Sequence, residues 1–427
     1  MSYREYPELA ERVYWKTLSN GLTVAVLPRP GFTKKIAYFV TDYGAVHTQM
    51  TLDGKQQTAP AGVAHFLEHK LFDMPQRDVS AEFASLGAMV NAFTSYDMTA
   101  YYFSCTENFD NCLHLLLEFV STPYFTEETV SKEQGIIGQE IDMTADNPES
   151  AVFENLMGLM YENHPVRTPI LGTRQSIAQI TPQVLLDCHR GFYNPVNMML
   201  CVVGDVDPER VCTIAQDVLG TEKTACAGKQ IRWQEEMNCP KAFAAQTMEV
   251  AMPMFQLGFK AEPLEKGEAA VRQELVGDLA AEALFGESSE LYLRLYEQGT
   301  IDSSFGGGFE TVEGMAMLTA FGDAQEPEAV RDAILQQAQV IAADGISDQS
   351  FERMKRSAMG RRIRSIDSFD ATCFRLCAYY FSGFDYFRFP AIYGSIQKEE
   401  LQSFIRRVVT PERCSLSVIQ PKSEEVS

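Results

Sequence analysis

The 427-residue sequence has no run of about 20 consecutive apolar residues, so it predicts no membrane-spanning helix. Its first residues, MSYREYPELAERVYW, lack the short apolar stretch of a secretion signal. Basic side chains are also few, since 36 Lys and Arg stand against 58 Asp and Glu, a formal net charge of -22. Because such a field repels phosphate backbones and anionic lipids, we expect no nucleic-acid and no membrane partner. These absences predict a soluble, cytoplasmic protein.

The ten cysteines are scattered and form no Cys-x-x-Cys pair, so the sequence does not predict a disulfide framework. Cys373 and Cys377 lie one helical turn apart and could be interpreted as a metal-binding pair. We favour a helix that buries two small apolar side chains, because free cysteine behaves as a small hydrophobic residue. Without an export signal, reduced thiols are expected.

Apolar residues make up 45% of the chain and charged residues 22%, which is typical of a globular protein. The length exceeds what one hydrophobic core supports and predicts two to four domains at ~150 residues each. The hydrophobic patterns of the first half predict strands at 21–28 and 36–40, helices at 62–72 and 79–86, a hairpin at 89–105, helices at 109–120, 127–143 and 182–193, and a strand at 198–203.

A similar order of elements returns in the second half of the chain. The patterns there predict strand structure at 244–261, one long helix at 266–297, a strand pair at 303–321, helices at 326–343, 350–365 and 401–409, and a strand at 414–419. We therefore predict an α+β fold of two tandem homologous lobes, residues 1–222 and 242–427, joined by a polar linker at 223–241. A repeat of this length indicates duplicated lobes rather than a solenoid, whose periods are ~20–50 residues.

The most informative stretch is Ala64-His65-Phe66-Leu67-Glu68-His69. On a helix, positions 65, 68 and 69 fall within an arc of roughly 100°. Imidazoles at i and i+4 can bind one zinc ion, and the carboxylate between them could take a proton from water at the open position of the metal. This His-x-x-Glu-His pattern is the inverzincin signature. A surface helix that happens to carry these residues is the alternative, but only six histidines occur in the chain.

A catalytic zinc needs a third protein ligand, and the segment 132–143 offers two candidates. Glu133 and Glu140 are seven residues apart and lie on one stripe of a predicted helix. A glutamate that borders the apolar face of Ile136, Ile137 and Ile141 needs a partner, which a cation would provide. The alternative is that both glutamates are solvated carboxylates on the helix surface.

The chain resembles the pitrilysin/insulinase family of zinc metallopeptidases, most closely its small bacterial YmfH-type members. The segments that carry the resemblance are GLTVAVLP at 21–28, AHFLEHKLF at 64–72, NAFTS at 91–95, KEQGIIGQEIDMTADNP at 132–148, HPVRTPILGT at 164–173 and FYNPVNMMLCVVGDV at 192–206. They span nearly all of the first half in the family's order, whereas the second half is similar in architecture more than in motif.

The resemblance implies a role for each residue of the motif. It implies one Zn²⁺ per chain with His65, His69 and Glu140 as ligands, Glu68 as general base and Glu133 as a supporting carboxylate. It also implies two lobes that close like a clamshell over a chamber. The segment 89–94 is then an edge strand that pairs with the peptide substrate, with Asn91 and Ala92 as the contacts. For Asn91, a plain turn or strand-end hydrogen bond is an open alternative.

The second half departs from the family pattern at one catalytic position. Family enzymes use an arginine and a tyrosine there, and Arg294 is roughly placed, but Asp302 stands where the tyrosine is expected. When the halves are aligned through Phe72 and Phe285, the places of His65, Glu68 and His69 are taken by Asp278, Ala281 and Glu282. The second lobe is therefore predicted to hold no metal. We expect a homologous partner chain that supplies the arginine and tyrosine, or a homodimer.

These inferences predict a zinc metalloendopeptidase that hydrolyses short or unfolded peptides bound as an extended strand. Two other classes stay open. One is a non-hydrolysing assembly or binding subunit of a two-chain complex. The other is a dedicated processing factor, which the resemblance alone links to modification of a translation elongation factor.

Overall fold

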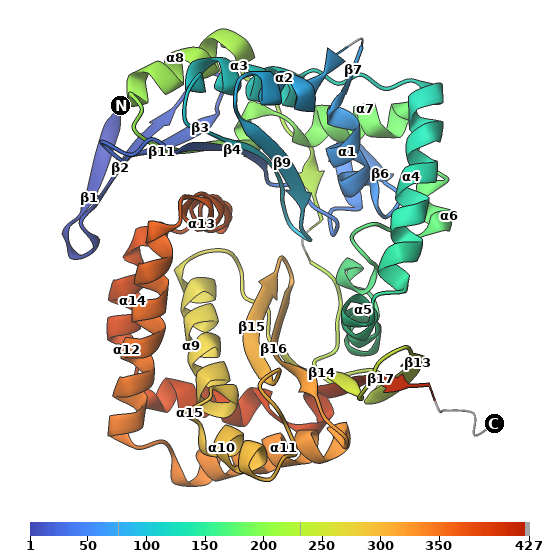
Figure 1. Cartoon of the computed structure of the whole chain (residues 1–427), viewed down its shortest axis with the longest axis vertical. Coiled ribbons are helices and arrows are strands. Elements are labelled where there is room, and N and C mark those ends of the chain that lie inside the picture. Colours follow the sequence, from blue (N-terminus) through green and yellow to red (C-terminus); the bar gives the residue numbers. More distant parts are fainter. Residues whose placement is uncertain (76, 231, 423–427) are drawn as a thin grey trace. The chain divides into compact units, whose positions relative to one another are not determined.

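The computed structural model describes residues 1–75, 77–230 and 232–422, which form two compact units (Figure 1). Unit 1 comprises Met1–Ile141, Pro169–Gln230 and Ile363–Arg388, and unit 2 comprises Asp142–Thr168, Ile231–Arg362 and Phe389–Ser427. Each unit therefore combines segments from both halves of the chain. The predicted mixture of helices and strands in two similar lobes is confirmed, because the main sheets of the two units have related topologies.

The sheet of unit 1 has seven strands in the order β1-β2-β3-β11-β4-β10-β9. Their bounds are β1 Ser2–Tyr6, β2 Glu11–Thr17, β3 Thr23–Pro28, β4 Lys35–Thr41, β9 Met89–Thr94, β10 Thr99–Cys105 and β11 Met198–Gly204. The pair β11 and β3 is parallel, and the other neighbours are antiparallel. Strand β9 lies at the edge, so one side of its backbone has no partner in this sheet.

Helices cover both faces of this sheet (Figure 1). The helices of unit 1 are α1 Val63–Leu71, α2 Val79–Ser85, α3 Phe109–Ser121, α4 Glu127–Ala145, α6 Arg174–Ile177, α7 Pro182–Phe192, α8 Pro208–Leu219 and α13 Phe369–Phe381; Ala145 and the three residues before it belong to unit 2. Short strands β5 Gln49–Leu52, β6 Lys55–Thr58 and β12 Gly228–Lys229 form a small sheet, and β7 Asp73–Met74 pairs with β8 Arg77–Asp78. The alternation of side chains along the strands places Leu200 and Val202 of β11 in the core.

The sheet of unit 2 repeats five strands of unit 1. Its order β13-β17-β14-β16-β15 has the same parallel and antiparallel senses as β3-β11-β4-β10-β9. The strands are β13 Phe243–Met248, β14 Met254–Ala261, β15 Gly306–Val312, β16 Met315–Asp323 and β17 Cys414–Pro421. The helices are α5 Pro148–Met160, α9 Glu268–Phe285, α10 Glu290–Glu297, α11 Pro327–Asp344, α12 Asp348–Arg364, α14 Phe389–Ser395 and α15 Lys398–Val408.

The two units exchange one helix each. Helix α13, from the second half of the chain, packs on β11 and β4 of unit 1, whereas α5, from the first half, packs on the corresponding β17 and β14 of unit 2. The sequence analysis did not predict this exchange. The predicted lobe boundaries at residues 222 and 242 stay a prediction. Cys373 and Cys377 are fully buried in α13, as expected for a helix that treats them as apolar residues.

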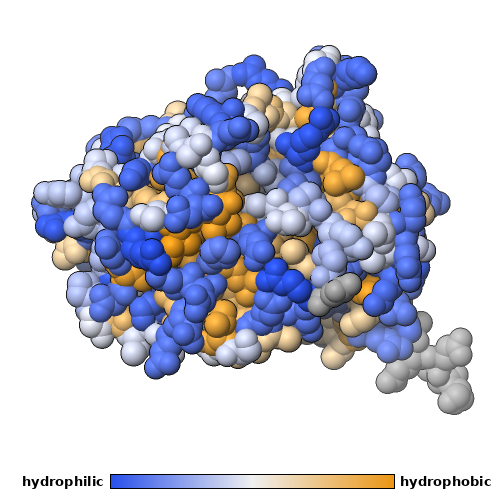
Figure 2. Space-filling view, turned by 90° about the horizontal axis from the view of Figure 1, so that it is seen from above, coloured by the Kyte–Doolittle hydropathy of each residue, from blue (hydrophilic) through white to orange (hydrophobic). Residues whose placement is uncertain are grey.

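Two predicted elements are wrong in detail. The long helix at 266–297 is two helices, because α9 ends before Gly286 and the side chain of Ser289 caps the start of α10. The strand structure at 244–261 is also interrupted, between β13 and β14. Among the described residues, no helix combines the length and apolarity that a bilayer crossing requires. Hydrophilic residues dominate the face shown in Figure 2, with smaller hydrophobic areas between them.

Candidate metal centre

Helix α1 carries the His-x-x-Glu-His segment, and its start depends on a glycine. Gly62 precedes α1 with a φ of 91°, and a Cβ at this position would lie 2.4 Å from the carbonyl oxygen of Leu171. The helix buries Phe66, Leu67 and Leu71 in the core of unit 1. With those side chains inside, the 3.6-residue period turns the two histidines and the glutamate together toward α4 and β9.

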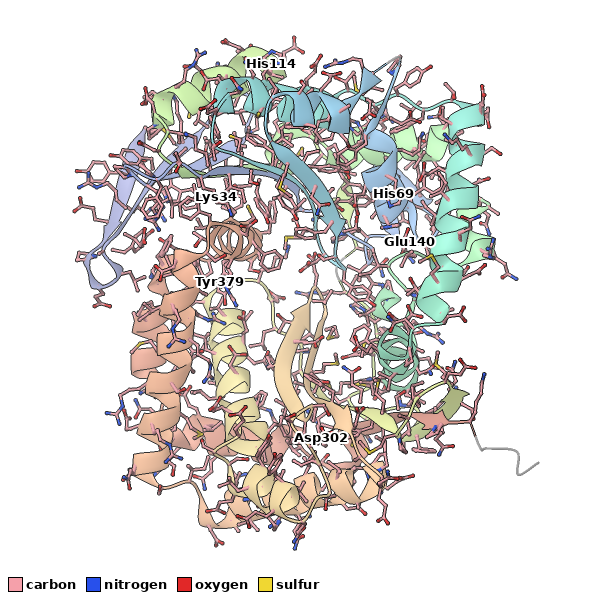
Figure 3. All side chains as sticks on the ribbon, viewed as in Figure 1. Lys34, His69, His114, Glu140, Asp302 and Tyr379 are labelled. Atoms are coloured by element: carbon pink, nitrogen blue, oxygen red, sulfur yellow. The ribbon has the colours of Figure 1, made fainter. Side chains whose placement is uncertain are left out.

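The two imidazoles of α1 converge on one carboxylate of α4. His65 Nε2 lies 3.7 Å from Glu140 Oε1, and His69 Nε2 lies 3.8 Å from Glu140 Oε2. Figure 3 shows His69 on α1 beside Glu140 on α4. Two ligand atoms that each lie ~2.0–2.2 Å from a tetrahedral zinc are roughly 3.3–3.6 Å apart. The observed separations therefore fit a zinc ion after a shift of a few tenths of an ångström.

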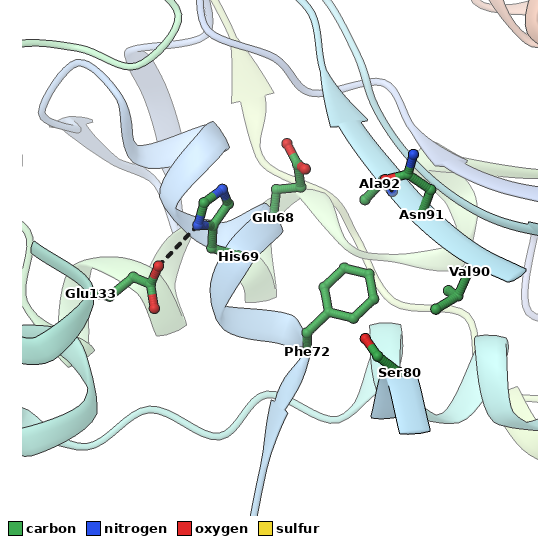
Figure 4. Close-up of a pocket in the computed structure, with 8 residues that line it drawn as sticks. All are labelled: Glu68, His69, Phe72, Ser80, Val90, Asn91, Ala92 and Glu133. Carbon is green, nitrogen blue, oxygen red and sulfur yellow. Dashed lines mark hydrogen bonds and ion pairs between the residues drawn. The ribbon is translucent and has the colours of Figure 1, made fainter. Parts of the chain in front are cut away.

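A second carboxylate of α4 orients one of these histidines. His69 Nδ1 donates a hydrogen bond to Glu133 Oε1 at 2.9 Å, drawn as a dashed line in Figure 4. This contact leaves Nε2, the nitrogen that faces Glu140, as the acceptor atom. Metal-binding histidines commonly donate their other N–H to a carboxylate in this way. By contrast, His65 Nδ1 is buried and has no hydrogen-bond partner in the described part of the chain.

The surroundings of the two histidines shift their pKa values in opposite directions. Burial, with the nearby His69, lowers the pKa of His65 to about 3, so this ring is neutral and able to bind a metal at neutral pH. For His69, burial is the largest single influence and lowers the pKa. The hydrogen bond and charge of Glu133, with the charges of Glu68 and Glu140, outweigh burial, so the net pKa is raised.

The Glu68 carboxylate points away from the Glu133 side of the site toward the edge strand (Figure 4). Its Oε2 accepts a hydrogen bond of 2.7 Å from Thr94 Oγ1 at the end of β9. Burial raises the pKa of Glu68, and the Thr94 hydrogen bond opposes this effect. A partly buried carboxylate with a raised pKa has the character of a general base or acid.

A cavity of about 350 Å³ connects this group to the edge strand. Its lining residues, drawn in Figure 4, are Glu68, His69, Phe72, Ser80, Val90, Asn91, Ala92 and Glu133. Charged groups lie at one end, and the Phe72 ring and Val90 provide an apolar wall. The cavity has room for the side chain of a bound molecule next to Glu68 and His69.

The structure brings together all seven residues that the sequence analysis assigned to the site. His65, His69 and Glu140 form the one group of three possible ligands found among the described residues, with ligand atoms within 4.8 Å of one another. The functional roles of these residues stay predictions. Asn91 Oδ1 accepts a hydrogen bond from the amide of Ala92 at 2.9 Å, in the interior of β9 and not at a turn or strand end.

The sequence analysis missed four residues near the site, namely Thr94, Phe72, Ser80 and Val90. Thr94 and Phe72 lie within the quoted segments NAFTS and AHFLEHKLF, but neither was given a role. The two-residue period of a strand places 90, 92 and 94 on one face of β9, so the alternation itself could have indicated Thr94. Ser80 lies on α2, and no local pattern distinguishes it.

The corresponding helix of unit 2 carries ion pairs instead of a candidate metal group. Asp278 pairs with Arg362 at 3.1 Å, and Glu282 pairs with Arg361 at 2.7 Å. These carboxylates occupy the places of the two histidines. Asp302 accepts hydrogen bonds from the backbone amide and the hydroxyl of Ser304. A carboxylate therefore stands at the position where the family pattern has the phenol of a tyrosine.

Comparisons with known proteins agree with this geometry. Residues 55–174 match the family described as insulinase (peptidase family M16), and residues 179–358 match the domain described as peptidase M16 inactive domain. A Bacillus subtilis protein named uncharacterized zinc protease YmfH is 37% identical over 426 residues, which are 98% of this chain and 99% of that protein. An uncharacterized zinc protease of Rickettsia felis is 29% identical over 48% of this chain and 49% of its own length.

Solved structures show the same relationship. A crystal structure described as an M16-like peptidase from Alicyclobacillus acidocaldarius superposes with a TM-score of 0.93 at 30% identity, covering 98% of this chain and 100% of that one. A protease from Helicobacter pylori has the same fold, with a TM-score of 0.83 at 18% identity over 96% of this chain and 100% of its own. The chain thus belongs to the insulinase family of peptidases, family M16.

Proposed function

We propose that the chain is a zinc-dependent endopeptidase whose metal ligands are His65, His69 and Glu140 and whose general base is Glu68. The observation that carries the proposal is the convergence of both Nε2 atoms on Glu140, with the Glu68 carboxylate beside them. The donor set of two imidazoles and one carboxylate is a known catalytic zinc set, which leaves a fourth position open. Zinc held there supplies Lewis-acid chemistry, because it lowers the pKa of water toward ~7 and polarises a carbonyl.

The residues of the chain perform the proton transfers and the positioning. Glu68 accepts the proton of the attacking water and delivers it to the departing amine, so one carboxylate serves both halves of the reaction. Glu133 holds the His69 ring in one tautomer through the 2.9 Å hydrogen bond. Burial keeps His65 neutral, so that a proton does not compete for its ring nitrogen.

The edge position of β9 supports binding of the substrate as an extended strand. A peptide that pairs with β9 gains backbone hydrogen bonds with little demand on its sequence. The cavity beside Phe72 and Val90 would then hold one side chain next to the scissile bond. Short or unfolded peptides fit this mode, because a folded protein does not offer a free extended segment.

Catalysis by this chain is proposed to need a related partner chain, or a second copy. The support is chemical: Asp302 stands where the family pattern has a tyrosine, and a carboxylate cannot donate a hydrogen bond to a developing oxyanion when it is ionised. A partner that carries the arginine and tyrosine would restore those donors.

The test is cleavage of an internally quenched peptide library by the purified chain, alone and with a candidate partner chain, with and without a zinc chelator. Cleavage that needs the partner and is lost with chelator supports the proposal. Glu68→Gln should retain zinc and lose about 10²–10⁴-fold in rate. Loss of zinc in that variant would make Glu68 a ligand instead. Zinc without any cleavage would favour a binding subunit, and full turnover by the chain alone would remove the partner requirement.

A further inference from the structure

The geometry points to Thr94 as a positioning residue that fixes the general base relative to the substrate-binding strand. This role rests on the proposed function. Thr94 Oγ1 donates a 2.7 Å hydrogen bond to Glu68 Oε2. Within the part of the chain that the structure describes, it is the one hydrogen-bond donor to this carboxylate. The contact joins α1, which carries the base, to β9, whose free edge would bind the peptide.

Thr94 is held by the backbone on both sides. It is the last residue of β9 and pairs in register with Thr99 of β10. The turn that follows is closed by Ser95, whose amide donates to the carbonyl oxygen of Met98 at 2.8 Å and whose hydroxyl donates to Asp97 Oδ1 at 2.9 Å. Because threonine is β-branched, its χ1 angle is also restricted. The hydroxyl is therefore directed at Glu68 by a stiff side chain on a fixed backbone.

A second segment anchors the same turn. The amides of Ala45 and Val46 donate to the carbonyl oxygens of Ser95 and Tyr96 at 3.1 and 2.9 Å. Gly44 allows this close approach, since a Cβ there would lie 2.6 Å from the amide of Asp97. The end of β9 is thus a rigid support for one small polar side chain.

The hydrogen bond has a consequence for the orientation of the base. It occupies one oxygen of Glu68, Oε2, and leaves Oε1 available to accept a proton from water. A peptide added to β9 is aligned with the strand, and Thr94 aligns the base with the same strand. Small misplacements of a catalytic group can cost up to about a hundredfold in rate, so a fixed hydroxyl at this point matters for kcat.

The experiment compares Thr94→Val, which keeps the shape of the side chain and removes the hydroxyl, with Thr94→Ser, which keeps the hydroxyl. We expect Thr94→Val to lower kcat by about tenfold to a hundredfold with KM and zinc content unchanged, and Thr94→Ser to recover most of this loss. Thr99→Val is the matched control, because the Thr99 hydroxyl donates to the carbonyl oxygen of Tyr43 and not to Glu68. It should lower stability without a selective loss of kcat.

An unfolding measurement without zinc or substrate tests the interaction between Thr94 and Glu68 independently of activity. In chelator-treated protein, Thr94→Val should lower the urea midpoint of unfolding more in the wild-type background than in Glu68→Ala, where the acceptor is absent. Equal kcat for wild type and Thr94→Val, equal effects in both backgrounds, or a similar loss of kcat in Thr99→Val would each overturn the role of Thr94. Wild-type protein with bound zinc and no chelator-sensitive cleavage would overturn the proposed function and, with it, this role; the unfolding comparison would still report the contact.

Discussion

Helices α1 and α9 occupy corresponding places beside two sheets of related topology, yet the polar side chains of the two helices have different partners. In unit 1, His65 and His69 face the carboxylates of α4, and no lysine or arginine among the described residues pairs with Glu140. In unit 2, acidic side chains of α9 pair with Arg361 and Arg362 of α12. In unit 2 the acidic side chains of α9 are paired with arginines of the same unit, whereas unit 1 presents two imidazoles and a carboxylate that could hold a cation.

This difference shows two ways in which corresponding helices of two similar sheets satisfy their polar side chains. The carboxylates of α9 that stand at the places of the two histidines are paired with arginines of α12, so their charges are compensated without a cation. Arg362 is nearly buried, at 7% exposed, and its guanidinium also lies over the rings of Phe389 and Tyr393. A buried charge of this kind needs its partners, because an unpaired one is strongly destabilising.

The largest effect is expected when corresponding residues of α1 and α9 are replaced by alanine. His69→Ala removes a proposed zinc ligand in unit 1 and should abolish both stable zinc binding and hydrolysis. Glu282→Ala removes the residue at the corresponding place in unit 2 and should leave the zinc content unchanged. Metal analysis of both purified variants after dialysis measures how much zinc each variant retains. Zinc retained by His69→Ala, or lost in Glu282→Ala, would contradict the assignment of the site to α1.

A smaller effect is expected at the carboxylate that supports His69. Glu133→Gln keeps the size of the side chain but removes the charge that orients and polarises the ring. Because such supporting contacts are typically worth 10–100-fold in metal affinity, zinc should bind about that much more weakly. Competition with a calibrated chelator measures the affinity. Glu128→Gln, at an exposed position in the first turn of the same helix, is the control and should bind zinc like the wild type.

The ion pairs of unit 2 give the next effect. Arg362→Ala leaves Glu274 and Asp278 without their shared partner, and both carboxylates are partly exposed, at 22% and 32%. We expect a loss of about 2 kcal/mol in the free energy of unfolding, below the ~3–5 kcal/mol of a fully buried pair. Arg361→Ala is the control, because Arg361 is 52% exposed and its pair should contribute less than about 1 kcal/mol. Urea unfolding of chelated protein measures both, and equal losses would contradict the role of burial.

Local patterns in the sequence predicted the elements that place the site, for physical reasons. The apolar residues of α1 and the alternation in β9 and β10 are set by neighbours a few positions away, so they are visible without tertiary structure. The histidines and Glu140 were likewise brought to one side of their helices by the 3.6-residue period alone.

Other features depend on contacts that sequence spacing does not encode. The exchange of α5 and α13 brings together residues that are far apart in the chain. An example is the contact between Cys373 of α13 and Cys201 of β11. The hydrogen bond from Thr94 to Glu68 depends on how β9 packs against α1, and periodicity alone cannot fix that distance. The break between α9 and α10 is different, because Gly286 and Ser289 are ordinary stop and start signals that could have been used.

The smallest expected effect compares two histidines that sequence patterns alone would treat alike. Buried His189 donates from Nε2 to the carbonyl oxygen of Val120 at 2.9 Å, and burial lowers its pKa to about 4. Exposed His114 lies on α3 of the same unit. The folded pKa of His189 is below the ~6.5 of an unfolded histidine, so its contribution to stability is complete above about pH 6.5 and is lost as the pH falls toward about 4.

Between pH 7 and 5.5 this linkage should cost the wild type about 1 kcal/mol more than His189→Gln, whose amide can still donate to Val120 but does not titrate. His114→Gln replaces an exposed histidine of the same unit and is the matched control for the loss of an imidazole. The measurement is the free energy of unfolding in urea at each pH, with chelator present so that every protein is compared without bound metal. An unchanged pH dependence in His189→Gln would mean that the buried ring accepts a proton without cost, and burial at this position of unit 1 would then not control its charge.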